Sequence, residues 1–379
     1  MMNILKDWYC QAEDHLQDLK KACFSNVVRL ERSTTPMYHP DPTYFARNGL
    51  SRGRKVEGQP PDIDFCCYGF DDKDRLAHAS EIYTQTLYLY DGEVVRIVTY
   101  NDDIVVHVGL LEYEGEKLRS FKRFGEGYGP YYVYSEMVFH YRGNQIVRLE
   151  EDYRVTGRAF PESWDGRSRE YTFHYDDNGT ISKILCRHGS SREVLVVYDI
   201  RDPRVSIADE LSRRLARATV EKIIELDFRE PVFYLGMSYS FSVDSPLSST
   251  CMALGTVRER DEMIEKYNRN EIEIIWDPGE YEHFHDAFRM DDTLQELVDF
   301  IDLEYALTNN ETLVISLLNR TARKLLEYDW TSILKTDPDF AVLAVEEEGF
   351  GFEENVREIL PIELRKRLMQ KGYFLDLYE

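Results

Sequence analysis

The sequence lacks several features that would identify a class of protein directly. Its six cysteines are few for 379 residues and show none of the spacing of a zinc site or a redox motif, which favours reduced, mostly buried thiols. No segment approaches the roughly 18 consecutive apolar residues of a membrane span, and no apolar signal core follows Met1. These absences predict a soluble cytoplasmic protein without disulfides.

Sequence motifs of common catalytic sites are also missing. There is no Gly-x-Ser-x-Gly nucleophile motif and no Walker sequence, so the hydrolases and nucleotidases that carry them are not indicated. Nothing in the sequence implies a cofactor. We therefore expect a protein that binds a partner without catalysing a reaction.

Positive charge is scarce. The chain has 70 acidic and 46 basic side chains, which gives a formal net charge of −24. This charge disfavours binding to nucleic-acid and membrane surfaces and favours a basic protein partner. From residue 201 onward there are 38 acidic and 21 basic side chains, a net charge of −17, against −7 in the first 200 residues. The acidic C-terminal part is the candidate binding region, although such charge can also serve solubility alone.

One short sequence motif, or phrase, recurs between residues 63 and 198. It consists of an aromatic residue, one or two polar residues, a turn residue, and then alternating apolar and polar residues. It is clearest at Tyr90-Asp91-Gly92 and returns at Tyr113, Tyr141 and Tyr175. Because a tight hairpin turn requires positive φ, which Gly tolerates, the repeats predict an antiparallel meander over residues 65–199. A helix over residues 3–24, apolar at three- and four-residue intervals, is predicted to lie against this sheet.

The repeated phrase resembles the tyrosine-aspartate repeat of bacterial RHS and YD-repeat proteins, in which a strand ending in Tyr-Asp turns through Gly into the next strand. The resemblance covers residues 65–199 and implies an array of β-hairpins. Uneven spacing favours an open, twisted sheet with variable loops over a closed shell; the aromatic anchors are Phe70, Tyr90, Tyr113, Tyr141, Tyr175 and Tyr198.

The hydrophobic period changes near residues 201–204 from that of strands to the roughly 3.6 residues of a helix, so we predict domains of residues 1–200 and 201–379. In the second domain a strand over residues 232–243 has an antiparallel partner at 249–255, and Thr256 with Glu259 forms a capping box. A short buried strand is expected over residues 341–346. This mixture predicts an α+β domain on a small antiparallel sheet.

Three segments of the second domain, 239–244, 255–259 and 275–281, are similar to an uncharacterised bacterial family with a strand pair, an Asn-Thr-Glu-type helix start and a Trp-x-Pro-x-Glu-Trp segment. Gly255 and Tyr281 replace the Asn and the second Trp of that pattern. Proteins of this type are associated with immunity functions in polymorphic-toxin systems. The resemblance therefore implies an immunity protein that neutralises a cognate toxin, for example a nuclease whose basic cleft an acidic inhibitor can occupy.

Two acidic runs near the C-terminus flank the segment Gly-Phe-Gly-Phe. Apolar anchors ringed by charge have the composition of a protein-contact patch, and solvated loop charge is the alternative interpretation. The candidate partner-binding residues are Glu346, Glu347, Glu348, Phe350, Phe352, Glu353 and Glu354.

A compact cluster of histidines and a carboxylate, His283-Phe284-His285-Asp286, suggests a different function. On a strand His283 and His285 would share a face and could ligate one metal ion, whereas on a helix they would diverge by about 200°. No third ligand at suitable spacing is visible. A metal-dependent hydrolase using this cluster is therefore one alternative, and a sheet scaffold that binds a peptide or glycan on its tyrosine-rich face is another.

Overall fold

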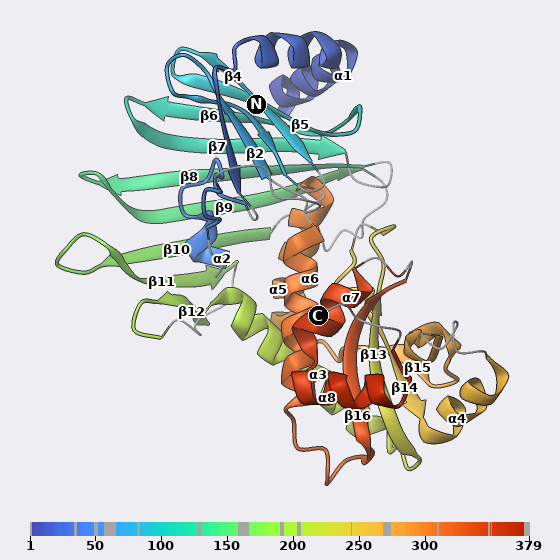
Figure 1. Ribbon diagram of the computed structural model, residues 1–379. Helices are drawn as coiled ribbons and strands as arrows, with labels where there is room; N and C mark the ends of the chain where they lie inside the picture. The colour runs from blue at the N-terminus through green and yellow to red at the C-terminus, as the bar shows by residue number, and fades with distance from the viewer. Residues whose placement is uncertain are drawn as a thin grey trace. The chain divides into compact units, whose positions relative to one another are not determined.

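The computed structural model shows two compact units (Figure 1). Unit 1 comprises Met1–Ile207 with Leu303–Asn310, and unit 2 comprises Ala208–Asp302 with Glu311–Glu379. The first division therefore falls just after the change of hydrophobic period at residues 201–204. The structure describes residues 2–33, 36–48, 52–56, 66–81, 84–126, 131–157, 167–189, 193–202, 206–243, 245–267, 274–308, 311–347, 349 and 351–374.

Within the described residues, unit 1 is built on one sheet of 12 antiparallel strands that pair in sequence order. The strands are β1 (Arg29–Ser33), β2 (Cys66–Phe70), β3 (Leu76–Ser80), β4 (Gln85–Asp91), β5 (Val94–Asn101), β6 (Ile104–Glu114), β7 (Lys117–Glu126), β8 (Tyr131–Arg142), β9 (Gln145–Gly157), β10 (Arg167–Tyr175), β11 (Ile181–His188) and β12 (Val194–Asp199). The predicted meander is confirmed. It gains an edge strand, β1, and a short helix, α2 (Tyr44–Asn48), from a stretch rich in Pro and Gly.

The repeat glycines adopt the backbone conformation that the turns require. Gly92, Gly115, Gly143 and Gly179 have φ values of 63°, 61°, 58° and 79°. The first three each begin a two-residue connection between paired strands. Since a side chain strains this left-handed conformation, the glycines fix where each hairpin turns.

The repeat tyrosines connect neighbouring hairpins. Each of three phenol hydroxyls donates a hydrogen bond to the backbone carbonyl of the first apolar residue after the turn of the preceding repeat. The donor and acceptor residues are Tyr90 and Leu76 (2.9 Å), Tyr141 and Leu118 (3.1 Å), and Tyr175 and Ile146 (2.8 Å). The ring covers a half-buried face while its hydroxyl satisfies a carbonyl, which gives a physical reason for Tyr in place of Phe at these positions.

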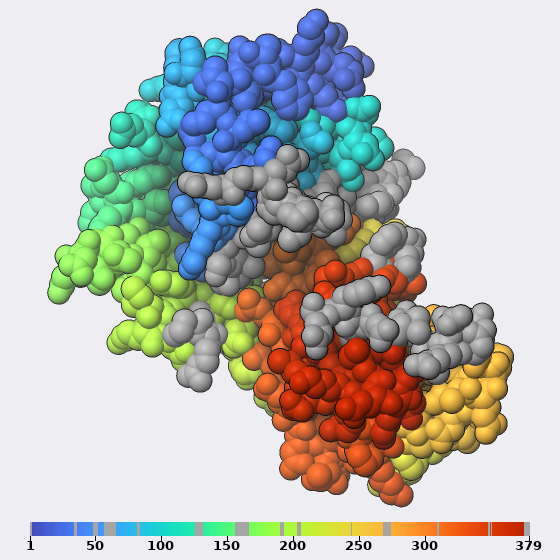
Figure 2. Space-filling model, in the orientation of Figure 1, coloured from blue at the N-terminus to red at the C-terminus, as the bar shows by residue number. Residues whose placement is uncertain are grey.

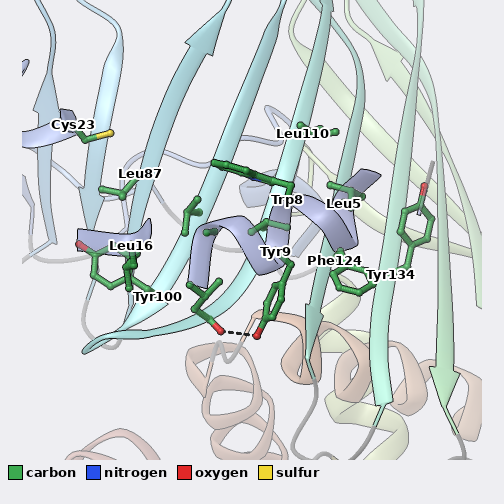
Figure 3. Packing of buried hydrophobic residues seen from close by; sticks show 14 residues of the cluster. Leu5, Trp8, Tyr9, Leu16, Cys23, Leu87, Tyr100, Leu110, Phe124 and Tyr134 are labelled. Atoms are coloured by element: carbon green, nitrogen blue, oxygen red, sulfur yellow. Dashed lines mark hydrogen bonds between the residues drawn. The ribbon is translucent and has the colours of Figure 1, made fainter. Parts of the chain in front are cut away.

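Helix α1 (Met2–Ser25) covers one face of the sheet over β4, β6 and β7 (Figures 1 and 3). Its apolar side chains bury themselves against the sheet; the core includes Leu5, Trp8, Ala12, Leu16, Leu87, Val98, Val108, Phe124 and Tyr134. The Tyr9 hydroxyl donates to the Val105 carbonyl at 2.9 Å, the dashed line in Figure 3. The predicted packing helix is confirmed.

The other face of the sheet carries buried ion pairs. Successive side chains of β7 point to opposite faces of the sheet. Phe124 faces α1, so its neighbour Arg123 points to the other face. Its guanidinium, 1% exposed, donates two hydrogen bonds of 2.6 and 2.7 Å to the carboxylate of Glu304 and one of 3.0 Å to the Tyr153 hydroxyl. Glu304 belongs to the segment Leu303–Asn310 that unit 1 includes.

A second buried cation in unit 1 is Arg47 of α2, whose guanidinium lies 2.5 Å from the carboxylate of Asp41 and 3.3 Å from that of Glu151. The sequence marks Arg47 as part of a basic cluster with Arg52, Arg54 and Lys55. Because a lone buried charge is costly, Arg47 must keep these two acidic partners. The charges of Arg123 and Arg47 are therefore compensated by buried carboxylates inside the fold.

Unit 2 combines helices with a four-stranded sheet, counted over the part of the chain that the structure describes, in the order β15-β14-β13-β16. Helices α7 and α8, red in Figure 2, form part of its surface. The elements are α3 (Ile207–Leu226), β13 (Pro231–Tyr239), β14 (Cys251–Thr256), α4 (Val257–Lys266), a 3-10 turn (Pro278–Glu280), β15 (Phe284–Asp286), α5 (Asp292–Thr308), α6 (Glu311–Leu326), β16 (Lys335–Glu346), α7 (Phe352–Ile359) and α8 (Ile362–Gln370). Residues 303–308 of α5 are grouped with unit 1. No helix of the described ranges is long and apolar enough to cross a bilayer.

The sheet of unit 2 is mixed, which corrects the expectation of a purely antiparallel one. The predicted antiparallel pair of β13 and β14 and the capping box of Thr256 and Glu259 are both present. However, β16 runs parallel to β13. A continuous apolar run such as residues 341–345 is typical of a strand buried on both faces but does not fix its direction. The helices between the two strands supply the long crossover that a parallel pair needs.

Candidate binding pocket

A pocket of about 400 Å³ lies in unit 2 where β13 and β16 end. Because these strands run parallel, their carboxyl ends meet at one edge of the sheet, where ligand crevices of such sheets commonly form. Its volume is within the roughly 300–1,000 Å³ of small-ligand pockets. Aromatic residues and carboxylates together line it, most prominently Trp276, Phe284, Phe352, Glu346, Glu347 and Asp277.

Trp276 is held in place on three sides. Its indole N–H donates to the Tyr373 carbonyl at 2.7 Å, and its ring stacks on Phe374 with centroids 4.8 Å apart. The hydroxyl of Tyr234, from the middle of β13, donates to the Trp276 carbonyl at 2.7 Å. Trp276 is 1% exposed, so it forms a fixed, buried support behind the pocket.

The turn after Trp276 depends on its own polar groups. Asp277 caps the 3-10 turn, its carboxylate accepting from the Gly279 N–H at 2.8 Å. Tyr281 then packs so closely on Gly255 that a Cβ there would lie 2.8 Å from the ring. The two positions at which this chain departs from the pattern of the resembling family, Gly255 and Tyr281, thus touch each other, and the small residue makes room for the ring.

Phe352 reaches the pocket because the chain turns sharply between β16 and α7. Among the described residues of that turn, Gly349 and Gly351 have left-handed backbones, with φ of 80° and 67°. On the buried side of α7, Asn355 donates to the Ala344 carbonyl at 3.2 Å and accepts from the Asn319 amide at 2.9 Å. These bonds fix the helix to β16 and to α6, and so fix Phe352 at its first position.

Negative charge gathers at the same place. Glu346, the last residue of β16, is only 4% exposed, and Glu347 beside it is exposed. Burial, together with the negative charge of Glu346, raises the pKa of Glu311, at the start of α6, to about 7. The pocket thus has a buried acid and an exposed acid beside its aromatic walls.

The structure brings only part of the predicted contact patch together. Glu346, Glu347 and Phe352 line the pocket, with Glu346 buried instead of at a solvated rim. Glu353 and Glu354 lie exposed in the first turn of α7, where Glu353 accepts from Arg357 at 3.2 Å. Glu348 and Phe350 lie outside the described residues.

The predicted contact patch did not include Trp276 and Phe284, two aromatic residues that line the pocket. They lie about 70 residues before that patch in the chain. The sequence features that could have identified them are local: Trp276 stands directly before an Asp-Pro-Gly turn, and Phe284 stands between two histidines. Phe284 is 41% exposed, which is unusual for a large apolar side chain on a strand. Its exposure marks it as a contact residue only once the pocket is seen.

The histidine cluster is only partly on the edge strand β15: His285 lies within it, and His283 immediately precedes it. His283 packs edge-on against Phe228 with centroids 4.7 Å apart, and burial together with Lys222 lowers the pKa of His285. Strand alternation directs Phe284, between the two histidines, to the opposite face. Over the described residues, no group of three or more His, Cys, Asp or Glu side chains is placed to hold a metal ion.

Comparison with known proteins identifies no relative: no protein-family model matches the chain, and no curated protein matches it significantly. The two family resemblances therefore depend on the residues quoted for them.

Proposed function

We propose that unit 2 is a non-enzymatic module that binds a basic protein, and that the chain acts as an immunity protein against a cognate toxin. The observation that carries the proposal is the pocket at the carboxyl ends of β13 and β16. It joins aromatic side chains to Glu346 and Glu347, two of the residues that the sequence places in a contact patch.

The chemistry of this surface suits a cationic partner. Aromatic anchors in a concave site supply most of the binding energy of protein interfaces, while charges at the rim steer the encounter. Three exposed carboxylates, Glu347, Glu353 and Glu354, lie at or near the pocket, within a region of net charge −17. The resemblance of segments 239–244, 255–259 and 275–281 to the immunity-associated family supports a toxin as the partner, and a nuclease toxin has the basic cleft that such a surface complements.

Co-expression with the product of the adjacent gene tests the role directly. If the proposal holds, that product is toxic alone, is harmless together with this chain, and co-purifies with it. A product that is harmless alone, or a toxicity that this chain does not reduce, would show that the immunity role is wrong.

Charge variants test where the partner binds. Replacing Glu347, Glu353 and Glu354 with Gln is expected to slow association about tenfold at low salt and to change it little at 1 M salt, where the screening length is about 3 Å. The matched control replaces three exposed glutamates that do not line the pocket, Glu265, Glu327 and Glu363. Both variants have the same net charge, so equal effects would place the binding surface elsewhere.

A further inference from the structure

Strand β15, at one end of the sheet of unit 2, has an open side. Among the described strands it pairs only with β14. Two backbone hydrogen bonds of 3.0 Å join the flanks of β15 to this neighbour, from the Leu254 N–H to the His283 carbonyl and from the Ala287 N–H to the Thr250 carbonyl. Because the backbone groups of successive residues point alternately towards and away from the partner strand, those of Phe284 and Asp286 point away from β14. No described residue pairs with these N–H and C=O groups.

The open side of β15 adjoins the pocket. Directly paired residues of neighbouring strands have their side chains on the same face of a sheet, and one such row across this sheet consists of Asp286, Cys251, Ser238 and Val345. Ser238 and Val345 line the pocket, so Asp286, and with it Phe284 two residues before, lies on the pocket face. Phe284 itself lines the pocket and is 41% exposed.

An exposed apolar ring is unusual at an open edge. Natural sheets protect their edges with short strands, charges, proline or covering elements, because unpaired backbone groups recruit another strand. Strand β15 is short, yet it exposes Phe284 beside a pocket. This combination suits the addition of a strand, in which main-chain hydrogen bonds supply affinity and pockets for alternate side chains supply specificity.

The charges around this edge favour a basic segment as the added strand. Asp286 is exposed, no Lys or Arg of the described part of the chain forms an ion pair with it, and Asp277 and Glu347 line the adjoining pocket. The cation Lys222 acts on the pKa of His285, whose side chain points to the other face of the sheet. A second copy of this chain would bring the same acids to the edge, and like charges oppose such pairing.

We propose that β15 accepts an extended segment of the basic protein partner as an additional strand of the sheet. The backbone of this segment pairs with the outward N–H and C=O groups of Phe284 and Asp286. On the pocket face it carries an apolar side chain against Phe284 and, two residues away, a lysine or arginine against Asp286, since cross-strand neighbours lie about 5 Å apart. The open edge is a feature of the structure, whereas the identity of the partner rests on the proposed function.

Hydrogen exchange of single backbone amides tests the edge in the full chain. In the free protein the amides of Phe284 and Asp286 are expected to exchange about tenfold or more faster than that of His285, which points to β14. In the complex with the adjacent gene product both are expected to slow about tenfold or more, because the added strand accepts their hydrogen bonds. Slow exchange of both amides in the dilute free chain would overturn the inference, because the edge would then already be occupied.

Two variants separate the backbone contact from the side chain. Asp286→Pro removes an outward N–H while leaving the bonds to β14, and an edge strand tolerates proline at such a position. The matched control Asp286→Ala removes the carboxylate and keeps the N–H. Asp286→Ala is expected to weaken binding of the adjacent gene product about threefold at low salt, and Asp286→Pro about thirtyfold. Thermal melts verify that both variants fold, and equal binding by the two would refute strand addition.

Failure of this inference differs from failure of the proposed function. If the adjacent gene product binds while the amides of Phe284 and Asp286 still exchange fast, strand addition is wrong and the immunity role stands, even where Asp286→Pro fails to fold. If that product does not bind the wild type, the immunity role is wrong, and so is the proposed source of the strand. Protection that increases with the concentration of this chain alone would mean that a second copy occupies the edge, which also contradicts the proposal.

Discussion

A comparison of the two units shows acidic side chains in two kinds of surroundings, and unit 2 contains both. In unit 1 the carboxylates of Glu304, Asp41 and Glu151 are buried against Arg123 and Arg47, so their charge is cancelled within the fold. In unit 2, Asp339 is likewise buried beside Arg367 and Lys371, whereas Glu346, Glu347 and Asp277 line a pocket. A high acidic count therefore says little by itself, since the pairing of each carboxylate decides whether it stabilises the fold or faces a partner.

Helix α5 shows this contrast within three residues. Burial alone would raise the pKa of Glu304, but its ion pair and hydrogen bonds with Arg123 outweigh burial and lower the pKa to about 2. Burial raises the pKa of Asp302 to about 7, aided by Asp299 and opposed by hydrogen bonds from Ser248 and the Leu247 N–H. Asp302, which belongs to unit 2, receives only neutral donors, and without a cation the cost of burial prevails.

The largest effect is expected from Arg123→Ala, which would remove the cation of the buried pair in unit 1. Loss of one partner of such a pair leaves a desolvated carboxylate at Glu304 and costs about 3–5 kcal/mol of unfolding free energy. Urea denaturation followed by circular dichroism measures it. The control Arg119→Ala lies on the same strand, in an exposed pair with Glu114, and is expected to cost no more than about 0.5 kcal/mol. Equal costs for both variants would show that burial of the pair is unimportant.

The second test concerns how the unfolding free energy falls at low pH. Because the pKa of Glu304 is lowered from 4.5 to about 2 on folding, its contribution is present above pH 4.5 and is lost as the pH falls towards 2. The difference in unfolding free energy between wild type and Glu304→Gln should shrink over that window by up to about 1.4 kcal/mol per pH unit. Denaturation at pH 5, 4 and 3 measures it, and a difference independent of pH would contradict the lowered pKa.

Asp302 is expected to show the opposite sign. Its pKa rises from 3.8 to about 7 on folding, so its contribution is complete below pH 3.8 and is lost as the pH rises through 7. Asp302→Asn does not titrate, and wild type should lose stability relative to this variant between about pH 4 and pH 7, again by at most about 1.4 kcal/mol per pH unit. The same denaturation series, extended to pH 8, decides the point. Parallel curves would mean that Asp302 is ionised at no cost.

The smallest effect concerns the hairpin array. Tyr141→Phe removes the hydroxyl that donates to the Leu118 carbonyl and should cost about 1 kcal/mol, the usual worth of one such hydrogen bond. The control Tyr328→Phe changes an exposed tyrosine of unit 2 and should cost almost nothing. Thermal melts of both variants report the difference. An unchanged melting temperature for Tyr141→Phe would show that the hydroxyl does not connect the repeats.

Much of unit 1 could be predicted because its signals are local. The positive φ of Gly92, Gly115 and Gly143 follows from the turn itself, and alternation of apolar residues then sets the strands on either side. Strand β1 was missed because its five residues, Arg29–Ser33, are mostly polar and carry no clear alternation of apolar and polar residues.

The candidate site could be predicted only in part. The acidic run and Phe352 are visible in the sequence, but their pocket also needs Trp276 and Phe284, which arrive from a different part of unit 2. The sequence also treats Glu346 as one carboxylate of a solvated run, whereas the structure buries it at the end of β16. Burial depends on which elements pack over a residue, and no local pattern reports that.

The sequence by itself determined where the hairpins turn, which residues cap α4 and where the hydrophobic period changes, because backbone sterics and capping bonds act over a few residues. Only the tertiary structure decided that β16 runs parallel to β13, that Glu304 pairs with a cation, and that Asp302 accepts hydrogen bonds from neutral donors. Arg123 and Glu304 are 181 residues apart in the chain. Desolvation and the charge of a neighbour set the state of a carboxylate, and both are properties of the packed interior.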